Sequence, residues 1–292
     1  MQVSLTTLIQ VGLDGLLMGS VYSLVAIGLT LIWGVMNIVN FAHGEFMMLA
    51  MYLSYWSFTL LGINPYLSIL LNIPLMFMFG ALVQKTLIDR VLDSPHHIQI
   101  LLTVGLGLLL ENLALYLWSP DYRIINLKYL DATVRIADVS LGLSKLIAFL
   151  SSIFFAAILY SVLKRTTLGR AMRAVAEERE GAFLVGINVG RIYTISFGIA
   201  AACVGVAGAL VIPFFYTHPR VGLVFILMSF AVVVIGSMGN FFGALIGGLI
   251  IGLMESFGAF FLPGTLKLAA VFTIFILVLL FKPKGLFGKS GL

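Results

Sequence analysis

The chain has 292 residues, of which 61% are hydrophobic and only 10% are charged. Ordinary soluble domains carry about 25% charged residues, and a soluble core of this size cannot hide so much apolar surface from water. The composition therefore excludes an ordinary soluble protein and favours a membrane protein. The 17 basic and 12 acidic residues give a net charge of +5. The basic residues gather in connecting segments, as membrane topology requires, so this excess does not indicate binding to nucleic acid.

A helix that spans a membrane needs roughly 20 apolar residues, and the chain contains a series of such runs. The first run follows a start without Lys or Arg, so we expect it to act as an uncleaved anchor. The candidate spans are about Leu8–Trp33, Phe46–Leu61, Tyr66–Val83, Ile98–Trp118, Leu143–Leu163, Ile192–Phe215, Val224–Ile235, Phe242–Leu262 and Leu268–Phe281. Because the run at 224–235 is too short to cross upright, the sequence predicts an all-α polytopic protein with eight or nine membrane segments in one domain, residues 1–292.

The connecting segments predict the orientation in the membrane. Basic residues gather in residues 84–97, in residues 164–191 and in the tail, which carries Lys282, Lys284 and Lys289. Cytoplasmic loops are enriched in Lys and Arg, so all three segments and the C-terminus are expected to be cytoplasmic. Nine crossings with an external N-terminus satisfy this pattern. Residues 119–142 then lie outside, and their alternation of polar and apolar residues predicts a small cap or hairpin.

A polar segment interrupts the first two apolar runs. Its polar side chains are those of Asn37, Asn40, His43 and Glu45. Non-helical backbone at membrane depth is tolerated where it is buried in protein or lines a wet cavity. The segment is either a capped turn between two helices or part of a gate or subunit interface. No further His or Cys cluster accompanies His43, so no metal site is predicted.

Three carboxylates fall inside apolar runs, at Asp14, Glu111 and Glu255. Such residues seldom face lipid. Counted from the outer ends of their helices, all three lie roughly 10 Å below the external surface at 1.5 Å per residue. They either line an outer vestibule that attracts an ammonium group or join neighbouring helices through hydrogen bonds. A membrane enzyme using Asp14, Glu111 and His43 is not favoured, because no close catalytic constellation accompanies them; no catalytic residue is predicted.

The segment from Thr166 to Asn188 predicts a helix outside the membrane. Thr166 or Thr167 is a suitable N-cap, and Gly181 is a suitable end. Its charges oppose the helix dipole, with Arg residues at its start and Glu residues at its end. A local rule broken in this way often marks a functional surface, so we expect the segment to dock onto a cytoplasmic partner rather than to lie on the membrane. The docking residues are expected to be Leu168, Gly169, Arg170, Arg173, Ala176, Glu177, Glu178 and Gly186.

Glycines are frequent towards the C-terminus, where they lie at helical spacing. Small residues let membrane helices approach closely, so these positions predict helix packing or, alternatively, a surface that slides during transport. They are Gly236, Gly239, Gly243, Gly247, Gly248 and Gly252. The tail from Gly285 to Ser290 resembles part of a phosphate-binding loop, but Pro283 stands where the first glycine is needed. The strand and helix that such a loop requires are also missing from the pattern.

Three blocks in the right order resemble one family. The chain resembles the branched-chain amino acid ABC importer permeases, of the LivH-like type, in these blocks. The first is Gly19–Leu24 and Ala26–Gly28 with Asn40–Glu45, the second is Leu168–Asn188, and the third is Ile235–Gly239 and Gly243–Gly248 with the ending Pro283 and Gly285–Gly288. The resemblance covers about Leu8 to Gly288. One departure is Ser237, where the family usually has a second glycine.

The resemblance implies a permease subunit in a bacterial cytoplasmic membrane that transports branched-chain or other apolar amino acids by alternating access. It also implies a second permease subunit, two cytoplasmic ATPase subunits that bind ATP and Mg, and an external substrate-binding protein. The chain itself is then expected to bind no cofactor. The related alternative is a permease for urea, short amides or other amino acids. An ion-coupled secondary transporter, working through its buried carboxylates, is an alternative of a different class.

Overall fold

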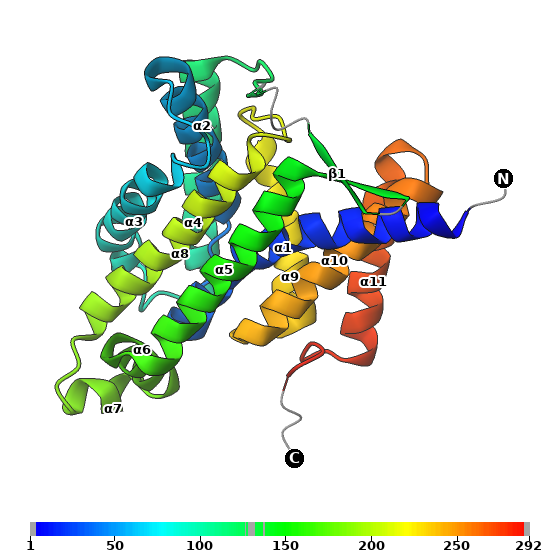
Figure 1. Ribbon diagram of the computed structural model, residues 1–292. Helices are drawn as coiled ribbons and strands as arrows, with labels where there is room; N and C mark the ends of the chain where they lie inside the picture. The colour runs from blue at the N-terminus through cyan, green and yellow to red at the C-terminus, as the bar shows by residue number, and fades with distance from the viewer. Residues whose placement is uncertain (1–3, 126, 128–131, 137, 289–292) are drawn as a thin grey trace.

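The computed structural model describes residues 4–288 except 126, 128–131 and 137, and most of the described chain is helical (Figure 1). The helices are, in chain order, α1 (Leu5–Met36), α2 (His43–Leu61), α3 (Ile69–Thr86), η1 (Ile88–Arg90), α4 (His96–Trp118), α5 (Leu143–Arg165), α6 (Thr167–Glu177), α7 (Arg179–Leu184), α8 (Val189–Val211), α9 (Val221–Gly236), α10 (Phe241–Phe261), η3 (Gly264–Leu266) and α11 (Lys267–Phe281). The strands β1 (Thr133–Ile136) and β2 (Val139–Gly142) form an antiparallel hairpin.

The predicted all-α membrane architecture is confirmed. Each apolar run of the sequence is helical in the structure, and the helices begin and end within a few residues of the expected positions. Among the described residues, six helices are long and apolar enough to span a membrane: α1, α3 with η1, α4, α5, α8 and α10. The apolar helices α9 and α11 are shorter. The number of crossings, eight or nine, stays a prediction.

Helix α1 forms the centre of the fold, because almost every side chain from Ser20 to Ile32 is buried. It packs against α10, α8, α5 and α9. Helix α10 lies antiparallel along the first half of α1, where the hydroxyl of Ser256 donates to the carbonyl of Val11 at 2.6 Å and that of Ser23 donates to the carbonyl of Leu245 at 2.7 Å. A helix buried on all sides needs apolar residues around its whole circumference, and the uniform hydrophobicity of α1 follows this requirement.

Glycines set the distance between α1 and α10. A Cβ atom on Gly15 would lie 2.7 Å from the carbonyl oxygen of Gly252, and one on Gly19 would lie 2.7 Å from that of Gly248. Real side chains do not approach so closely, so larger residues here would force the two helices apart. The contact therefore depends on small residues from both helices.

The segment between α4 and α5 contains the expected hairpin, in which Thr133 pairs with Gly142. Lys128 and Asp131, in the segment expected to lie outside the membrane, are not among the described residues. Before the hairpin, Arg123 and Thr217 pair through both backbone hydrogen bonds, at 2.9 and 2.8 Å. This bridge ties the segment after α4 to the loop between α8 and α9, so the two connections lie at the same end of the molecule.

The predicted single helix from Leu168 to Gly181 is wrong, because the chain breaks at Glu178. Thr166 caps α6 as expected, since its hydroxyl accepts the backbone N–H of Gly169 at 3.0 Å. Helix α6 ends at Glu177, and the extended residue Glu178 becomes the N-cap of α7. Its carboxylate then lies near the positive end of a helix dipole, the favourable arrangement. Charges that oppose the helix dipole thus remain only in α6, with Arg residues near its start and Glu177 at its end. Gly181, the expected helix end, lies inside α7.

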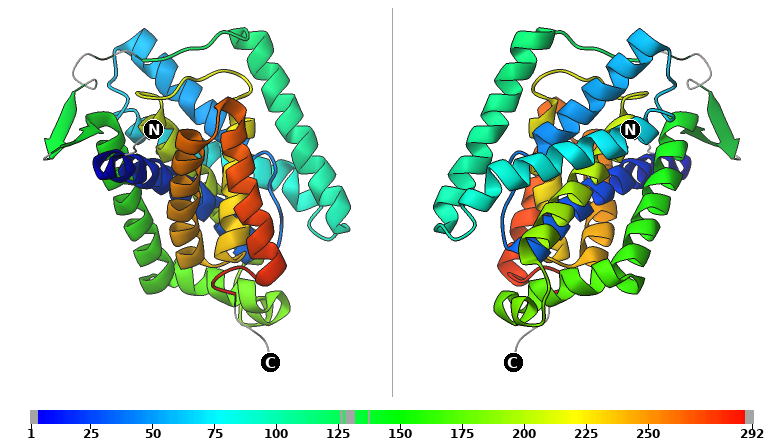
Figure 2. Two further views of the ribbon diagram at one scale, coloured as in Figure 1. Left: turned by 90° about the vertical axis from the view of Figure 1, so that its right-hand side faces the viewer. Right: turned by 90° about the vertical axis from the view of Figure 1, so that its left-hand side faces the viewer.

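The three basic segments lie at one end of the molecule. Figures 1 and 2 show α6, α7 and the C-terminal tail together at the bottom, away from the hairpin and the turn between α10 and α11. The segment before α4 belongs to this end because Asp93 forms a 2.6 Å ion pair with Arg179 of α7. The tail is tied to it as well, since the backbone N–H of Leu286 donates to the carbonyl of Ile235 at 2.7 Å. Lys289 lies outside the described residues.

Candidate functional site

A cavity of about 280 Å³ opens at the end of the molecule that carries the hairpin. We call it the hairpin-end cavity. It lies between α1, α5, α10 and α11, with the loop after α8 on one side. Its lining residues are Asp14, Gly15, Met18, Tyr22, Lys145, Phe214, Phe215, Gly252, Glu255, Ser256, Ala259 and Lys267. It therefore brings together two carboxylates, two ammonium groups and an apolar surface.

Each carboxylate in the hairpin-end cavity has a basic partner. Asp14 pairs with Lys145 at 2.9 Å, and Glu255 pairs with Lys267 at 2.9 Å. Glu255 also accepts the hydroxyl hydrogen of Tyr22 at 2.6 Å. The Glu255 side chain is 13% exposed whereas that of Asp14 is 32% exposed, so the Glu255 pair is the better shielded from water and the stronger of the two.

Glu111 does not belong to this cavity, so the expected common tier of three carboxylates is divided. Its carboxylate pairs with Arg220 at 3.0 Å, between α4 and the loop that leads into α9. Arg220 is largely exposed. In the same loop, partial burial and the nearby Arg220 lower the pKa of His218 below its usual value. Asp14 and Glu255 are therefore the two predicted carboxylates that the structure brings to one cavity.

The polar segment between α1 and α2 is a turn folded into the interior. Asn37 ends α1 in the left-handed conformation, and the side-chain oxygen of Asn40 accepts the backbone N–H of Ala42 at 3.1 Å. His43 is fully buried, and its Nε2 lies 3.1 Å from the carbonyl oxygen of Val25, to which it donates as Nε2–H. Glu45 is also buried, against Gly222 of α9. Asn40, His43 and Glu45 thus join α2 to α1 and α9 inside the chain, and only Asn37 is exposed.

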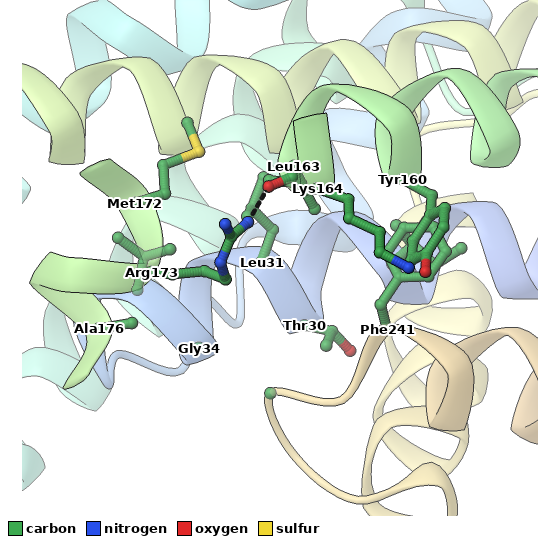
Figure 3. Close-up of a pocket in the computed structure, with 13 residues that line it drawn as sticks. Thr30, Leu31, Gly34, Tyr160, Leu163, Lys164, Met172, Arg173, Ala176 and Phe241 are labelled. Atoms are coloured by element: carbon green, nitrogen blue, oxygen red, sulfur yellow. Dashed lines mark hydrogen bonds between the residues drawn. The ribbon is translucent and has the colours of Figure 1, made fainter. Parts of the chain in front are cut away.

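A larger cavity, of about 630 Å³, opens at the other end of the molecule beside α6 (Figure 3). We call it the α6-end cavity. Its lining residues are Ile27, Thr30, Leu31, Gly34, Val35, Tyr160, Leu163, Lys164, Met172, Arg173, Ala176, Gly239 and Phe241. Sequence analysis did not find this cavity, because its walls come from helices far apart in the chain and most of its residues are apolar.

The same three helices, α1, α5 and α10, contribute to both cavities. Along α1, the hairpin-end cavity uses residues 14–22 and the α6-end cavity uses residues 27–35. Near the α6 end, α5 and α10 meet through Tyr160, whose ring centroid lies 5.6 Å from that of Phe241 and 4.9 Å from that of Phe242. The two cavities therefore follow one another along a single helix.

The helix α6 has one buried face and one exposed face. Gly169, Met172 and Val175 are buried, whereas Arg170 and Glu177 are exposed. Among the predicted docking residues, Leu168 packs partly against the core, and Arg173 and Ala176 line the α6-end cavity. Gly186 takes a φ of +86° in the turn before α8, a conformation that favours glycine.

The most exposed apolar surface at this end was missed by the sequence reasoning. Phe183, Leu184 and Val185, at and just after the end of α7, are 70%, 83% and 77% exposed. Three consecutive apolar residues within a polar segment were the signal that could have revealed them. Arg179 precedes them, and its hydrogen bond with Asp93 raises the pKa of this guanidinium above its usual value.

The glycines of the C-terminal block hold α9 against α10. Gly236 and Gly243 approach so closely that a Cβ on either would collide with the carbonyl group of the other. A Cβ on Gly247 would lie 2.8 Å from the carbonyl oxygen of Val232. Between the two helices, Gly239 has a φ of +80°, which favours glycine.

Comparison with known proteins identifies the family. The family described as the permease component of branched-chain amino acid transport systems matches residues 12–281. The chain is 30% identical, over 94% of both chains, to the branched-chain amino acid permease BraD of Pseudomonas aeruginosa. It is likewise 30% identical over 94% of both chains to LivH of Escherichia coli. A probable LivH of Methanocaldococcus jannaschii is 31% identical over 91% of this chain and 88% of its own.

No solved structure matches the chain. The family match nevertheless spans the bundle from α1 to α11, including both cavities and the α6–α7 segment. The resemblance seen in the sequence is thereby confirmed, and the chain belongs to the family of permease components of branched-chain amino acid transport systems.

Proposed function

We propose that the chain is one of two permease subunits of an ATP-driven importer and forms half of a pathway for branched-chain or similar apolar amino acids. The observation that carries the proposal is the match to BraD and LivH over 94% of both chains. As a member of this family, the chain is a multi-pass membrane transport subunit and not an enzyme. ATP and Mg are bound by two partner ATPases, and an external binding protein delivers the substrate.

The hairpin-end cavity suits the chemistry of such a substrate. An amino acid carries one ammonium and one carboxylate group, and the cavity offers both Glu255 and Lys267 within one ion pair. Met18, Phe214 and Phe215 supply apolar surface for a side chain. When an amino acid enters, its ammonium and carboxylate groups can replace the contact between Glu255 and Lys267. Every charge then keeps a partner, so the substrate avoids the cost of an isolated buried charge. We therefore assign Asp14 and Glu255 to the pathway.

The α6–α7 segment is proposed to transmit motion from the ATPases. Its exposed surface combines the basic and acidic residues of α6 with Phe183 and Leu184 of α7. Exposed apolar residues rimmed by charges are typical of protein–protein interfaces. Because α6 also packs on α1, α5 and α8, a push on α6 reaches the helices that line both cavities. Alternating access then follows from partners that favour one state over the other.

The proposed orientation places the α6 end in the cytoplasm and the hairpin outside. The basic residues Lys85, Arg90, Arg170 and Arg191 lie in segments of the α6 end, which is the pattern of cytoplasmic loops. In this arrangement the N-terminus is external, the C-terminus is cytoplasmic and the chain crosses the membrane nine times. The hairpin-end cavity then faces the external binding protein.

Reconstitution in proteoliposomes tests the function. The full chain, with the second permease, the ATPases and the binding protein, is expected to take up labelled leucine only when ATP is supplied on the side of the ATPases. Labelled urea and acetamide serve as competing substrates, and their preferential uptake would identify the related alternative. Uptake by this chain alone, driven by an ion gradient and without ATPases, would overturn the proposal in favour of a secondary transporter.

A further inference from the structure

The α6-end cavity has a composition that substrate passage does not explain. Its volume of about 630 Å³ lies in the range of small-molecule sites. Apolar side chains from four helices form most of its wall. Unlike the hairpin-end cavity, it has no Asp or Glu among its lining residues. A free amino acid would therefore find no carboxylate here for its ammonium group.

Two cationic side chains line this cavity. In Figure 3, Lys164 extends towards the aromatic residues, and its Nζ lies 5.4 Å from the centroid of the Tyr160 ring. Arg173 points towards α5 and donates a hydrogen bond to the carbonyl of Leu163. That contact uses one of the five N–H groups of a guanidinium. The charge of the lining is thus positive, which favours an anion.

A buried hydroxyl group provides an independent sign of a ligand. Thr30 lines the cavity and is only 4% exposed. Its Oγ1 is buried and has no hydrogen-bond partner. A threonine inside a helix usually bonds back to the carbonyl one turn earlier, and a buried hydroxyl without any partner is destabilising. The hydroxyl has almost no surface open to the cavity as the side chain stands, so a polar group of a ligand satisfies it only when the Thr30 side chain rotates towards the cavity.

We propose that the α6-end cavity binds a small aliphatic carboxylate that lacks an ammonium group. Lys164 and Arg173 attract the carboxylate, the apolar wall covers the tail, and Thr30 supplies a hydrogen bond. An amine is repelled by the two cations, and a neutral alcohol gains no ionic contact. The site is therefore selective for the charge of the head group.

The position of this site gives it a regulatory role. Met172, Arg173 and Ala176 belong to α6, whereas Thr30 and its neighbours belong to α1. A bound carboxylate bridges the helix proposed to receive the ATPase motion and the central helix of the fold. Its occupancy is expected to change substrate-stimulated ATP hydrolysis, and this part of the inference rests on the proposed function. The binding itself does not.

The binding is tested on the full chain in phosphatidylcholine nanodiscs, with any subunits that copurify. Hexanoate, 1-hexanol and hexylamine share one tail and differ in the charge of the head group, and leucine adds an ammonium to a carboxylate. Hexanoate is expected to raise the unfolding temperature, and the other three are not. Thr30→Val and Lys164→Gln should each weaken hexanoate binding by about tenfold, as expected for the loss of one strong hydrogen bond or ionic contact.

Matched controls separate the site from general effects. Thr194→Val removes a helix threonine that bonds back to Gly190, and Lys85→Gln removes an exposed lysine outside the cavity; both should bind hexanoate normally. An equal response to hexylamine, or normal binding by both cavity variants, would overturn the proposal. A response to phosphatidylglycerol in the nanodisc but none to hexanoate would overturn it too, because the site would then hold lipid. If the unmodified chain binds hexanoate but the reconstituted transporter does not take up leucine, only the proposed function is contradicted.

Discussion

The hydroxyl of Tyr22 lies 2.6 Å from the carboxylate of Glu255, whose other oxygen lies 2.9 Å from the ammonium group of Lys267. Glu255 thus joins the central helix α1 to α11 from its place on α10. The tyrosine is almost completely buried, so this contact lies at the deep side of the hairpin-end cavity. A substrate that reaches this depth has to compete with Tyr22 and Lys267 for the carboxylate.

Glu255→Gln is expected to slow ATP-dependent leucine uptake by about tenfold while the subunits still assemble, because it keeps the shape and removes the charge that an ammonium group needs. Uptake rates in proteoliposomes and the elution profile of the complex measure both effects. Glu111→Gln is the control, since its carboxylate pairs with Arg220 outside this cavity. An equal loss in both variants would contradict the pathway role.

Phe183→Ser is expected to reduce substrate-stimulated ATP hydrolysis without changing the stability of the isolated permease. The side chain is 70% exposed, so its removal takes away docking surface and leaves the core intact. Apolar anchors of this kind commonly contribute about 1–3 kcal/mol to an interface. Leu101→Ser on α4, which is 72% exposed, is the matched control. Normal hydrolysis by the Phe183 variant would count against docking at α7.

Paired cysteines measure the orientation. In a Cys203→Ser background, Glu177→Cys is expected to react with an impermeant reagent only from the cytoplasmic side, and Asp121→Cys only from outside. Both positions are exposed. Arg123 of the same external segment is unsuitable for labelling, because its guanidinium donates to the carbonyl of Trp118 at 2.7 Å and lies 5.1 Å from the ring of Trp56. Labelling of both cysteines from one side would refute the proposed topology.

Ser237→Gly is expected to raise the thermal stability of the chain. Ser237 ends α9 with a φ of +80°, a backbone conformation that costs a residue with a Cβ about 1–3 kcal/mol. Glycine adopts it freely, which also explains the glycine usual in the resembling family. The unfolding temperature in detergent measures the gain, and Ser237→Ala is the control that should not show it. A lower unfolding temperature for Ser237→Gly would show that the hydroxyl, rather than the backbone, dominates.

Gly44→Ala and Gly105→Ala should have opposite effects on stability. A Cβ on Gly44 would lie 2.8 Å from the Cβ of Ile226 and 2.9 Å from the carbonyl carbon of Gly222, so α2 and α9 would have to separate, at a cost of roughly 1–3 kcal/mol. A Cβ on Gly105 meets no atom within 4 Å, and alanine there improves helix propensity by up to about 1 kcal/mol. The unfolding temperatures of both variants, measured under the same conditions, test this prediction. Equal shifts in the two unfolding temperatures would refute the packing argument.

The helices could be predicted because their apolar runs have no other stable place than the membrane or the core. The break between α6 and α7 could not, since Glu178 lies in an apparently continuous helical pattern whose expected end was Gly181. Contacts between residues far apart in the chain, including the Arg179–Asp93 ion pair, occur at the break. Such contacts cannot be predicted from the helix propensities of neighbouring residues. For the same reason the sequence indicated the carboxylates Asp14 and Glu255 but not their pairing with Lys145 and Lys267, which come from separate helices.

The length of α1 has a mechanical consequence. Its 32 residues extend about 48 Å at 1.5 Å per residue, well beyond the roughly 30 Å of a hydrocarbon core, so the helix is long enough to cross the membrane at a tilt. The middle of α1 is buried by neighbouring helices on all sides. Its two halves line different cavities. A rod held near its centre acts as a lever. We expect a tilt of α1 about its middle to narrow one cavity and to widen the other.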